Sequence, residues 1–326
     1  MYYKRELVRK MMDEAGRVRT PFLFGLQFEE DEGFFLSHPL SQKGVLFDIN
    51  GECNTTPRPE TIDPFHFRAE PETYETYRKR FEMVMRGLHR GDSYLTNLTI
   101  RTPLQTSLTL EEIFHHSKAR YRLLIPGRLV CFSPECFVSI SEGRIATFPM
   151  KGTINASLPG AREIILNDPK EIAEHNTIVD LLRNDLSCVA RRVTVKRFRY
   201  LEKLSTNQGE ILQVSSEIEG TLPANYQEQL GSLIFALLPA GSVSGAPKEA
   251  TLRLIRAAEG KPRGYYCGVA GYFDGRSLDT FVMIRFIEQC DKQLFFRSGG
   301  GITANSDSLS EYREAIQKIY LPFQFS

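Results

Sequence analysis

Two pairs of glutamates are spaced so that each pair could place both carboxylates on one side of a helix. Glu171 and Glu174 are three residues apart, and so are Glu311 and Glu314. On a helix this spacing brings side chains to the same face, with Cβ atoms about 5–6 Å apart. Because Mg²⁺ prefers carboxylate, water and substrate oxygens as ligands, the two faces could converge on one such cation.

Both pairs also have an explanation that needs no metal. The first glutamate of each pair has capping-box spacing with a residue three positions earlier, Asp168 or Ser308, and would then merely help to start a helix. Glu314 and Lys318 have the i,i+4 spacing of a surface ion pair. Exposed helical glutamates are common, so spacing alone favours these structural roles over metal binding.

A lysine at the end of a predicted strand is the candidate nucleophile. Lys151 precedes a Gly-Thr turn, and its amine would be nucleophilic if burial or a nearby cation lowered its pKa. Glu135, in Ser-Pro-Glu, could act as a general acid if it lies close to that lysine. A surface ion pair between the two side chains is the alternative, and the two residues taken alone favour it.

Two glycine-rich segments could bind an anion or simply turn the chain. Gly-Ser-Val-Ser-Gly-Ala-Pro-Lys, residues 241–248, precedes a predicted helix whose exposed amides favour an anion, but it lacks the spacing of a P-loop. Three consecutive glycines, 299–301, are as easily a tight turn. Arg285 lies in an otherwise apolar predicted strand, where a charge needs a partner, and a carboxylate is the natural one.

The elements that must position these residues follow from hydrophobic periodicity. Helices are predicted over residues 6–15, 70–89, 169–186, 226–238, 248–259 and 309–320. Asp168 is predicted to cap the third helix, with Pro169 at its first position. Strands follow one another between the helices, including 22–28, 93–100, 128–132 and 211–218, and the polar run 152–163 interrupts the pattern. The sequence therefore predicts an α+β fold rather than a strict alternation of strands and helices.

Composition excludes several classes of protein. The 326 residues include 41 Lys plus Arg and 40 Asp plus Glu, a balance that offers no basic surface to nucleic acid. The six cysteines lack the spacing of a disulfide framework or a zinc site. No stretch has the apolar length of a membrane span or a signal peptide. We expect a cytoplasmic protein that binds neither nucleic acid nor membranes.

Taken in order, these segments resemble the chorismate-utilising enzyme family, which includes anthranilate synthase component I, aminodeoxychorismate synthase component I, isochorismate synthase and salicylate synthase. The resemblance covers residues 74–321. Its motifs are Ser-Pro-Glu at 133–135, Lys-Gly-Thr at 151–153, Ala-Glu-His at 173–175, the segment 241–248, and the glycines that precede Glu311 and Glu314. So many ordered matches override the structural explanations given above for the single motifs.

The resemblance implies a large two-lobed sandwich of mostly antiparallel sheets with helices packed outside. Residues 1–326 would form one catalytic unit, in which 1–70 is a shortened, β-rich N-terminal part, and chorismate would lie in the cleft. Glu174 and Glu314 would bind Mg²⁺ directly, and Glu171 and Glu311 through water. The family pattern implies the following substrate-binding residues: Thr153, His175, Ser244, Tyr266, Arg285, Gly299, Gly300, Gly301 and Lys318.

Lys151 separates the branches of the family, because anthranilate synthases resemble this stretch but carry alanine there. The resemblance therefore favours formation of 4-amino-4-deoxychorismate, on the route to p-aminobenzoate and folate. Lys151 would attack ring C2 while Glu135 protonates the leaving C4 hydroxyl, and ammonia would then add at C4 and expel the lysine. Isochorismate and salicylate synthases use a water-activating lysine at the position of Leu95, and that base is missing here.

The chain also departs from the family pattern at four positions. Leu95 stands where amino-transferring members usually have glutamine, Cys136 and Phe148 replace arginines, and Phe281 replaces a small residue. These departures bear on substrate geometry and turnover more than on substrate class. The Leu-Leu-Glu-Ser segment of the tryptophan-binding site is missing, so we do not expect feedback by tryptophan.

Ammonia would come from a separate glutamine amidotransferase subunit, because the chain lacks the Gly-x-Cys-x-Gly and His-x-Glu motifs of those enzymes. Two alternatives remain open from the sequence: anthranilate synthase component I, and a catalytically inactive chorismate-binding regulatory subunit. Lys151 counts against the first. Intact Glu135, Lys151, Glu174 and Glu314 count against the second.

Overall fold

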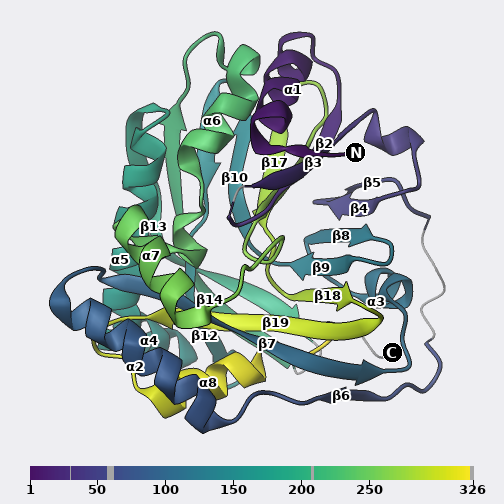
Figure 1. The fold of residues 1–326 in the computed structure, drawn as a ribbon. Helices are drawn as coiled ribbons and strands as arrows, with labels where there is room; N and C mark the ends of the chain where they lie inside the picture. Colours follow the sequence, from purple (N-terminus) through teal and green to yellow (C-terminus); the bar gives the residue numbers. More distant parts are fainter. Residues whose placement is uncertain (30, 57–61, 207–208, 324–326) are drawn as a thin grey trace.

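The protein is built from two large antiparallel sheets (Figure 1). The computed structural model describes residues 1–29, 31–56, 62–206 and 209–323. The order of the first sheet is β1 (Tyr2–Lys4), β3 (Glu32–Ser37), β2 (Phe22–Leu26), β16 (Val269–Phe273), β17 (Leu278–Val282), β10 (Cys136–Ser141), β11 (Arg144–Thr147), β14 (Gly209–Thr221) and β12 (Met150–Asn155); β13 (Arg191–Thr206) pairs with β14. The order of the second is β15 (Gly245–Ala246), β7 (Leu95–Thr106), β19 (Gln293–Ile302), β18 (Phe286–Cys290), β9 (Leu129–Ser133), β8 (Tyr121–Ile125), β4 (Leu46–Ile49) and β5 (Glu52–Cys53); β6 (Phe67–Ala69) pairs with β7.

Helices cover the outer surfaces of these sheets. They are α1 (Arg5–Arg17), α2 (Tyr74–Arg90), α3 (Leu110–His116), α4 (Ala161–Asn167), α5 (Pro169–Ser187), α6 (Leu230–Leu237), α7 (Lys248–Glu259) and α8 (Ser308–Gln317). In Figure 1, α2, α7 and α8 lie together beside β7 and β19, whereas α1 and α6 lie side by side at the opposite end. The predicted arrangement of mostly antiparallel sheets with helices outside is what the structure shows.

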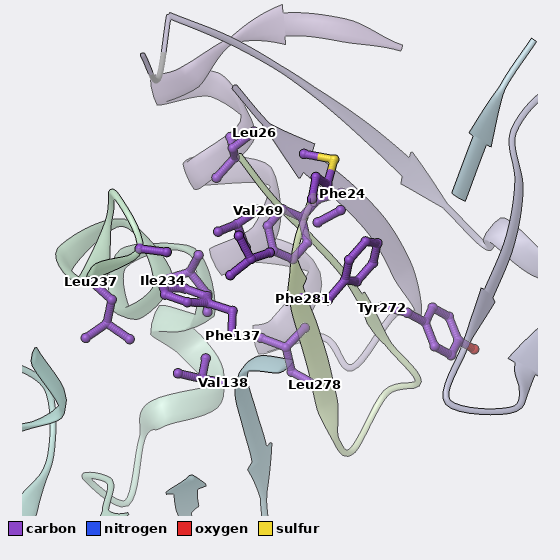
Figure 2. Packing of buried hydrophobic residues seen from close by; sticks show 14 of the residues in the cluster. Phe24, Leu26, Phe137, Val138, Ile234, Leu237, Val269, Tyr272, Leu278 and Phe281 are labelled. Atoms are coloured by element: carbon purple, nitrogen blue, oxygen red, sulfur yellow. The ribbon is translucent and has the colours of Figure 1, made fainter. Parts of the chain in front are cut away.

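One hydrophobic cluster draws residues from both sheets. Phe24 and Phe281 of the first sheet and Phe47 and Leu123 of the second belong to it, and each is fully buried. Figure 2 shows how side chains of β2, β10, β16 and β17 gather with Ile234 and Leu237 of α6. A smaller cluster packs α2, α7 and α8 against β7 and β19. The sheets and helices that carry the candidate residues are therefore fixed by continuous apolar packing.

Several predicted elements are confirmed with close boundaries. The helix predicted over 248–259 is α7, and the one predicted over 169–186 is α5. Asp168 caps α5 as expected, because its Oδ1 accepts hydrogen bonds from the backbone N–H groups of Lys170 and Glu171, at 2.9 and 3.0 Å. No helix in the described part of the chain is long and apolar enough to cross a membrane.

Two local predictions are wrong. The polar run 152–163 does not interrupt the sheet: β12 extends through Asn155 by pairing with β14, and α4 begins at Ala161. Arg285 does not lie in a strand, because it sits between β17 and β18 with a positive φ of 53°. In both places a contact with a distant segment overrides the local pattern.

Truncation of a side chain in the core should destabilise the protein. Leu237, with 1% of its surface exposed, packs in the cluster that spans both sheets, so Leu237→Ala should lower the free energy of unfolding by about 2–5 kcal/mol. Leu158 is 48% exposed, and Leu158→Ala, as the control, should change it by no more than about 0.5 kcal/mol. Urea denaturation followed by circular dichroism measures both, and equal effects would contradict the described packing.

Candidate active site

A cavity of about 570 Å³ brings most of the candidate residues together. Its size lies in the range of small-molecule sites, and its walls come from both sheets and from α5 and α8. The candidate residues that line it are Glu135, Lys151, Thr153, Glu171, Glu174, Tyr266, Arg285, Gly299, Gly300, Gly301, Glu314 and Lys318. Segments separated by more than half the length of the chain therefore meet in one site.

Lys151 is held in the cavity by an ion pair with a carboxylate of α5. Its Nζ lies 2.7 Å from Oε2 of Glu174, whose other oxygen is 3.7 Å from Nζ of Lys170. Burial lowers the pKa of Lys151, but the nearby carboxylates, with Glu174 contributing most, together outweigh burial and leave the pKa above its usual value. The lysine is thus a charged ammonium in this arrangement, and neither a depressed pKa nor an ion pair with Glu135 is present.

The backbone beside Lys151 requires glycine. Gly152 has a φ of 90°, in the left-handed region that favours glycine. A Cβ at this position would also lie 2.8 Å from Oε2 of Glu171. The lack of a side chain lets β12 approach the N-terminal turn of α5 closely enough for Lys151 to meet Glu174.

A second ion pair, between Lys318 and Glu314, lies in the wall of the cavity. Nζ of Lys318 lies 2.7 Å from Oε1 of Glu314 and donates a hydrogen bond to the carbonyl of Gly299 at 2.9 Å. Burial lowers the pKa of Lys318 in spite of this partner. A Cβ at Gly300 would lie 3.5 to 3.8 Å from Glu311, Lys318 and Glu314, so the glycine strand passes directly beside both carboxylates.

The helix-capping roles considered for two of the glutamates are not what the structure shows. Asp307, rather than Ser308, caps α8 by accepting a hydrogen bond from the backbone of Ser310 at 2.9 Å. Glu311 is buried, with 6% of its surface exposed, and accepts a hydrogen bond from Ser306 at 2.8 Å. At the start of α5, Oε2 of Glu171 is buried without a hydrogen-bond partner, although burying such an atom unpaired is costly.

These oxygens are a suitable donor set for Mg²⁺, although they do not form a closed metal site as they stand. Among the residues that the structure describes, no three His, Cys, Asp or Glu side chains lie close enough together to hold a metal ion. Lys151 and Lys318 instead pair with the two carboxylates predicted to bind the cation directly. The buried oxygen of Glu171 that lacks a hydrogen-bond partner is an atom that a water bound to such a cation would satisfy. The residues fit Mg²⁺ if the two ammonium groups change partners.

Glu135 faces the cavity with one oxygen already engaged. Oε1 accepts a hydrogen bond from the hydroxyl of Ser242. Burial raises the pKa of Glu135, and the hydrogen bond from Ser242 and the positive charges of Arg285 and Lys318 act in the opposite direction. A raised pKa suits a carboxyl group that must carry a proton to a substrate.

Arg285 has no carboxylate partner in the described part of the chain. Its guanidinium lies 5.4 Å from the ring centre of Tyr320 and lines the cavity. The positive φ of Arg285 turns the chain between β17 and β18 at this point. A half-buried guanidinium without an anion is ready to pair with one supplied by a ligand.

Besides Glu311, two candidate residues, His175 and Ser244, do not line the cavity. His175 is fully buried and shares a hydrogen bond with the hydroxyl of Ser216 at 2.7 Å; burial and the nearby Arg199 lower its pKa to about 4. Ser244 is also buried, and its hydroxyl donates to the carbonyl of Ala240 at 2.8 Å. Contact of either side chain with a substrate stays a prediction.

Several polar residues of the cavity wall were assigned no role from the sequence. They include Asn97, Gln213, Ser242, Thr303, Gln317 and Tyr320. Ser242 lies in the glycine-rich segment 241–248, so its position was noticeable, but its partner Glu135 is 107 residues away in the sequence. No local pattern reveals such a contact.

Comparison with known proteins places this site in context. Residues 29–323 match a family described as chorismate binding enzyme. A Haemophilus influenzae protein named uncharacterized PabA-like protein is 48% identical over 312 residues, which cover 95% of this chain and 94% of the relative. Aminodeoxychorismate synthase component 1 of Bacillus subtilis is 32% identical over 279 residues, which cover 81% of this chain and 57% of the relative.

A solved structure supports the same relationship. The crystal structure of anthranilate synthase component I from Streptococcus pneumoniae superposes with a TM-score of 0.66 at 26% identity, over 78% of this chain and 59% of that one. The likeness confirms the predicted fold class of two large antiparallel sheets with helices outside.

Because Lys151 pairs with Glu174, we expect Mg²⁺ to change the pKa of Lys151. This change can be measured without any catalytic reaction. If Mg²⁺ binds to Glu174, the negative charge of Glu174 raises the pKa of Lys151 less. Burial, which lowers this pKa, then has the larger effect. The pH midpoint for acetylation of Lys151 should then fall by about one unit on adding Mg²⁺, as measured by peptide mass spectrometry after competitive labelling.

Two controls make this measurement specific. Glu174→Gln should show the low midpoint already without Mg²⁺ and should no longer respond to the cation. Lys203, an exposed lysine 2.7 Å from Glu210, should keep its midpoint throughout. A Lys151 midpoint that is the same with and without Mg²⁺ would refute the exchange of partners.

Proposed function

Because the chain belongs to the chorismate binding enzyme family, we propose that it converts chorismate and ammonia to 4-amino-4-deoxychorismate and water. The single observation that carries this proposal is the presence of Lys151 and Glu135 in the wall of one cavity. An amine and a proton-donating carboxyl group are the two groups that a covalent amination of the ring requires.

The charges of the cavity suit a substrate with two carboxylates. Arg285 lacks a carboxylate partner in the described structure, and Glu314 does not fully stabilise the ammonium of Lys318, because burial still lowers the pKa of that lysine. Both side chains line the cavity with the backbone of the glycine triplet. Bidentate pairing with a guanidinium would fix the orientation of one carboxylate of chorismate.

The reaction would proceed in two displacements. Neutral Lys151 attacks ring C2, both ring double bonds shift around the ring toward C4, and the C4–O bond breaks as Glu135 donates its proton, so that the hydroxyl leaves as water. Ammonia then adds at C4, both double bonds shift back, and the bond between C2 and the lysine nitrogen breaks. Lys151 is regenerated, and the proton released by the incoming nitrogen returns to Glu135.

Four glutamates would hold the cation of this reaction. Glu174 and Glu314 are proposed to bind Mg²⁺ directly, and Glu171 and Glu311 through water; the bound cation would supply positive charge to the ring carboxylate and the departing hydroxyl. For the chain itself, the consequence is that Lys151 loses the partner that keeps it protonated. Its amine would then be available for the first displacement.

A glutamine amidotransferase subunit is the proposed source of ammonia. The Bacillus subtilis relative is named as component 1, and the present sequence lacks the nucleophile motif of a glutaminase. The proposal extends this arrangement to the present chain, with free ammonia as a substitute in vitro.

Formation of anthranilate in the same cavity is the second candidate. The likeness to the Streptococcus pneumoniae anthranilate synthase component I favours it, since that structure shares the fold. Lys151 argues against this candidate, because in the family pattern the enzymes that form anthranilate carry alanine rather than lysine at this position. The two candidates differ in product and in the need for Lys151.

Removal of the lysine amine tests the covalent mechanism. Lys151→Ala should lower formation of aminodeoxychorismate by roughly 10³-fold or more, because the nucleophile is gone. Wild-type protein quenched with chorismate and Mg²⁺ but without ammonia should carry an adduct of chorismate less water on Lys151, detected by intact-protein and peptide mass spectrometry. Lys203→Ala serves as the matched control and should retain both activity and adduct. An unchanged rate in Lys151→Ala would exclude the mechanism.

Removal of the proton donor tests the second role. Glu135→Gln keeps the size of the side chain but carries no acidic proton, so the rate should fall by roughly 10²–10⁴-fold. Steady-state kinetics with ammonium as the nitrogen source measures the loss. A rate within a few-fold of wild type would assign proton donation to another group.

A further inference from the structure

Ser242 is a cavity residue whose hydroxyl reaches the proposed proton donor. It lies in the short 3₁₀ turn η3 (Gly241–Val243) and donates a hydrogen bond to Oε1 of Glu135. No hydrogen bond to the other oxygen, Oε2, is present among the described residues. The two oxygens of this carboxyl group are therefore in different environments.

Residues that follow Ser242 anchor the turn that carries it. Just after Ser242, the carbonyl of Val243 accepts a hydrogen bond at 2.8 Å from Arg263, which is fully buried. Beyond the turn, Lys248 lies 3.0 Å from Asp185 of α5 and donates to the carbonyl of Leu237 at 2.6 Å. These contacts hold the backbone of η3, so the hydroxyl of Ser242 approaches Glu135 from a fixed direction.

The backbone of Glu135 is fixed as well. Its N–H donates to the hydroxyl of Ser133 at 3.1 Å, and its carbonyl accepts from the N–H of Val282 at 3.1 Å. The side chain can still rotate about its own bonds, and the hydrogen bond from Ser242 restricts this rotation.

The direction of that hydrogen bond decides which oxygen can carry a proton. A protonated carboxyl group has one hydroxyl oxygen and one carbonyl oxygen, and the carbonyl oxygen is the better acceptor. Because the hydroxyl of Ser242 donates to Oε1, Oε1 takes the carbonyl role and the acidic proton lies on Oε2.

We propose that Ser242 is a positioning residue for the proton donor: it keeps the acidic proton of Glu135 on Oε2 and orients that oxygen toward the leaving group of the substrate. The nature of the leaving group rests on the proposed function. The hydrogen bond itself acts on Glu135 whatever the substrate is.

The charges around Glu135 agree with this role. Burial raises the pKa of the carboxyl group, and the hydrogen bond from Ser242 opposes burial more strongly than the charge of either Arg285 or Lys318 does. Cys136 and Cys267 are the other titratable groups that interact with Glu135, and burial keeps both thiols neutral by raising their pKa to about 12. Loss of the hydroxyl at 242 should therefore raise the pKa of Glu135 further.

Ser242→Ala tests the proposal through two independent measurements. The first is the titration of the Glu135 carboxyl group, followed by the infrared band of the protonated acid and assigned by its loss in Glu135→Gln. The second is the pH dependence of kcat and kcat/KM. We expect the carboxyl midpoint and the alkaline limb of kcat/KM to move up by about one pH unit, with kcat about tenfold lower and KM nearly unchanged.

Further variants separate positioning from a general loss of structure. Ser242→Thr keeps the hydroxyl and should restore the midpoint, whereas Ser242→Cys keeps the size but donates weakly and should show the upward shift. Ser232→Ala is the matched control, because Ser232 also donates to a carboxylate, Oδ2 of Asp13 at 2.8 Å, between α1 and α6 and outside the cavity wall. It should leave the midpoint and the pH profile unchanged.

The outcomes distinguish this proposal from the proposed function. An upward shift of the carboxyl midpoint supports the role of Ser242 even if the product turns out not to be aminodeoxychorismate. Wild-type values of both the midpoint and kcat in Ser242→Ala and Ser242→Cys would overturn it, and so would a failure of Ser242→Thr to restore the midpoint.

Discussion

Compensation of charge inside the cavity is the constraint on which the rest of the site depends. Four carboxylates come from two helices: Glu171, Glu174 and Glu314 line the cavity, and Glu311 lies buried beside Gly300. An unpaired buried charge costs several kcal/mol, so Lys151 and Lys318 are drawn into ion pairs of 2.7 Å with two of them. These pairs connect β12 to α5 and orient the end of α8 beside β19, and they thereby bring the reactive groups together.

The same constraint explains how the site could change state during turnover. Chorismate has two carboxylates and Mg²⁺ has two positive charges, so their joint arrival would leave the net charge of the cavity unchanged. The lysines could then exchange glutamate partners for substrate carboxylates while the glutamates take the cation. Such an exchange avoids the cost of an isolated buried charge at each stage, and it links substrate binding to the deprotonation of Lys151.

The fold was predictable where local signals and tertiary contacts agree. Asp168 and Pro169 mark the start of α5, and a left-handed Gly260 ends α7, so both helices follow from the sequence. The polar run after Lys151 was misread because β12 gains its strand conformation from pairing with β14, about sixty residues further along. The turn at Arg285 likewise depends on contacts made by the flanking strands.

The sequence predicted which residues make up most of the candidate site, but not which of these residues contact one another. Ordered motifs identified the lysine, the glutamates and the glycine triplet that line the cavity. Residue types could not show that Lys151 pairs with Glu174 rather than Glu135, or that Ser242 bonds to Glu135, because these contacts join segments far apart in the chain. His175 and Ser244 belong to the same motifs, but both side chains are buried and neither lines the cavity.

The most direct test of the central claim is the identity of the product. The protein would be incubated with chorismate, Mg²⁺ and ammonium, with and without an added aminodeoxychorismate lyase, and the products identified by mass spectrometry. We expect a product in which the ring hydroxyl of chorismate is replaced by an amino group, and p-aminobenzoate only when the lyase is present. Anthranilate formed without any lyase, or chorismate recovered unchanged, would contradict it.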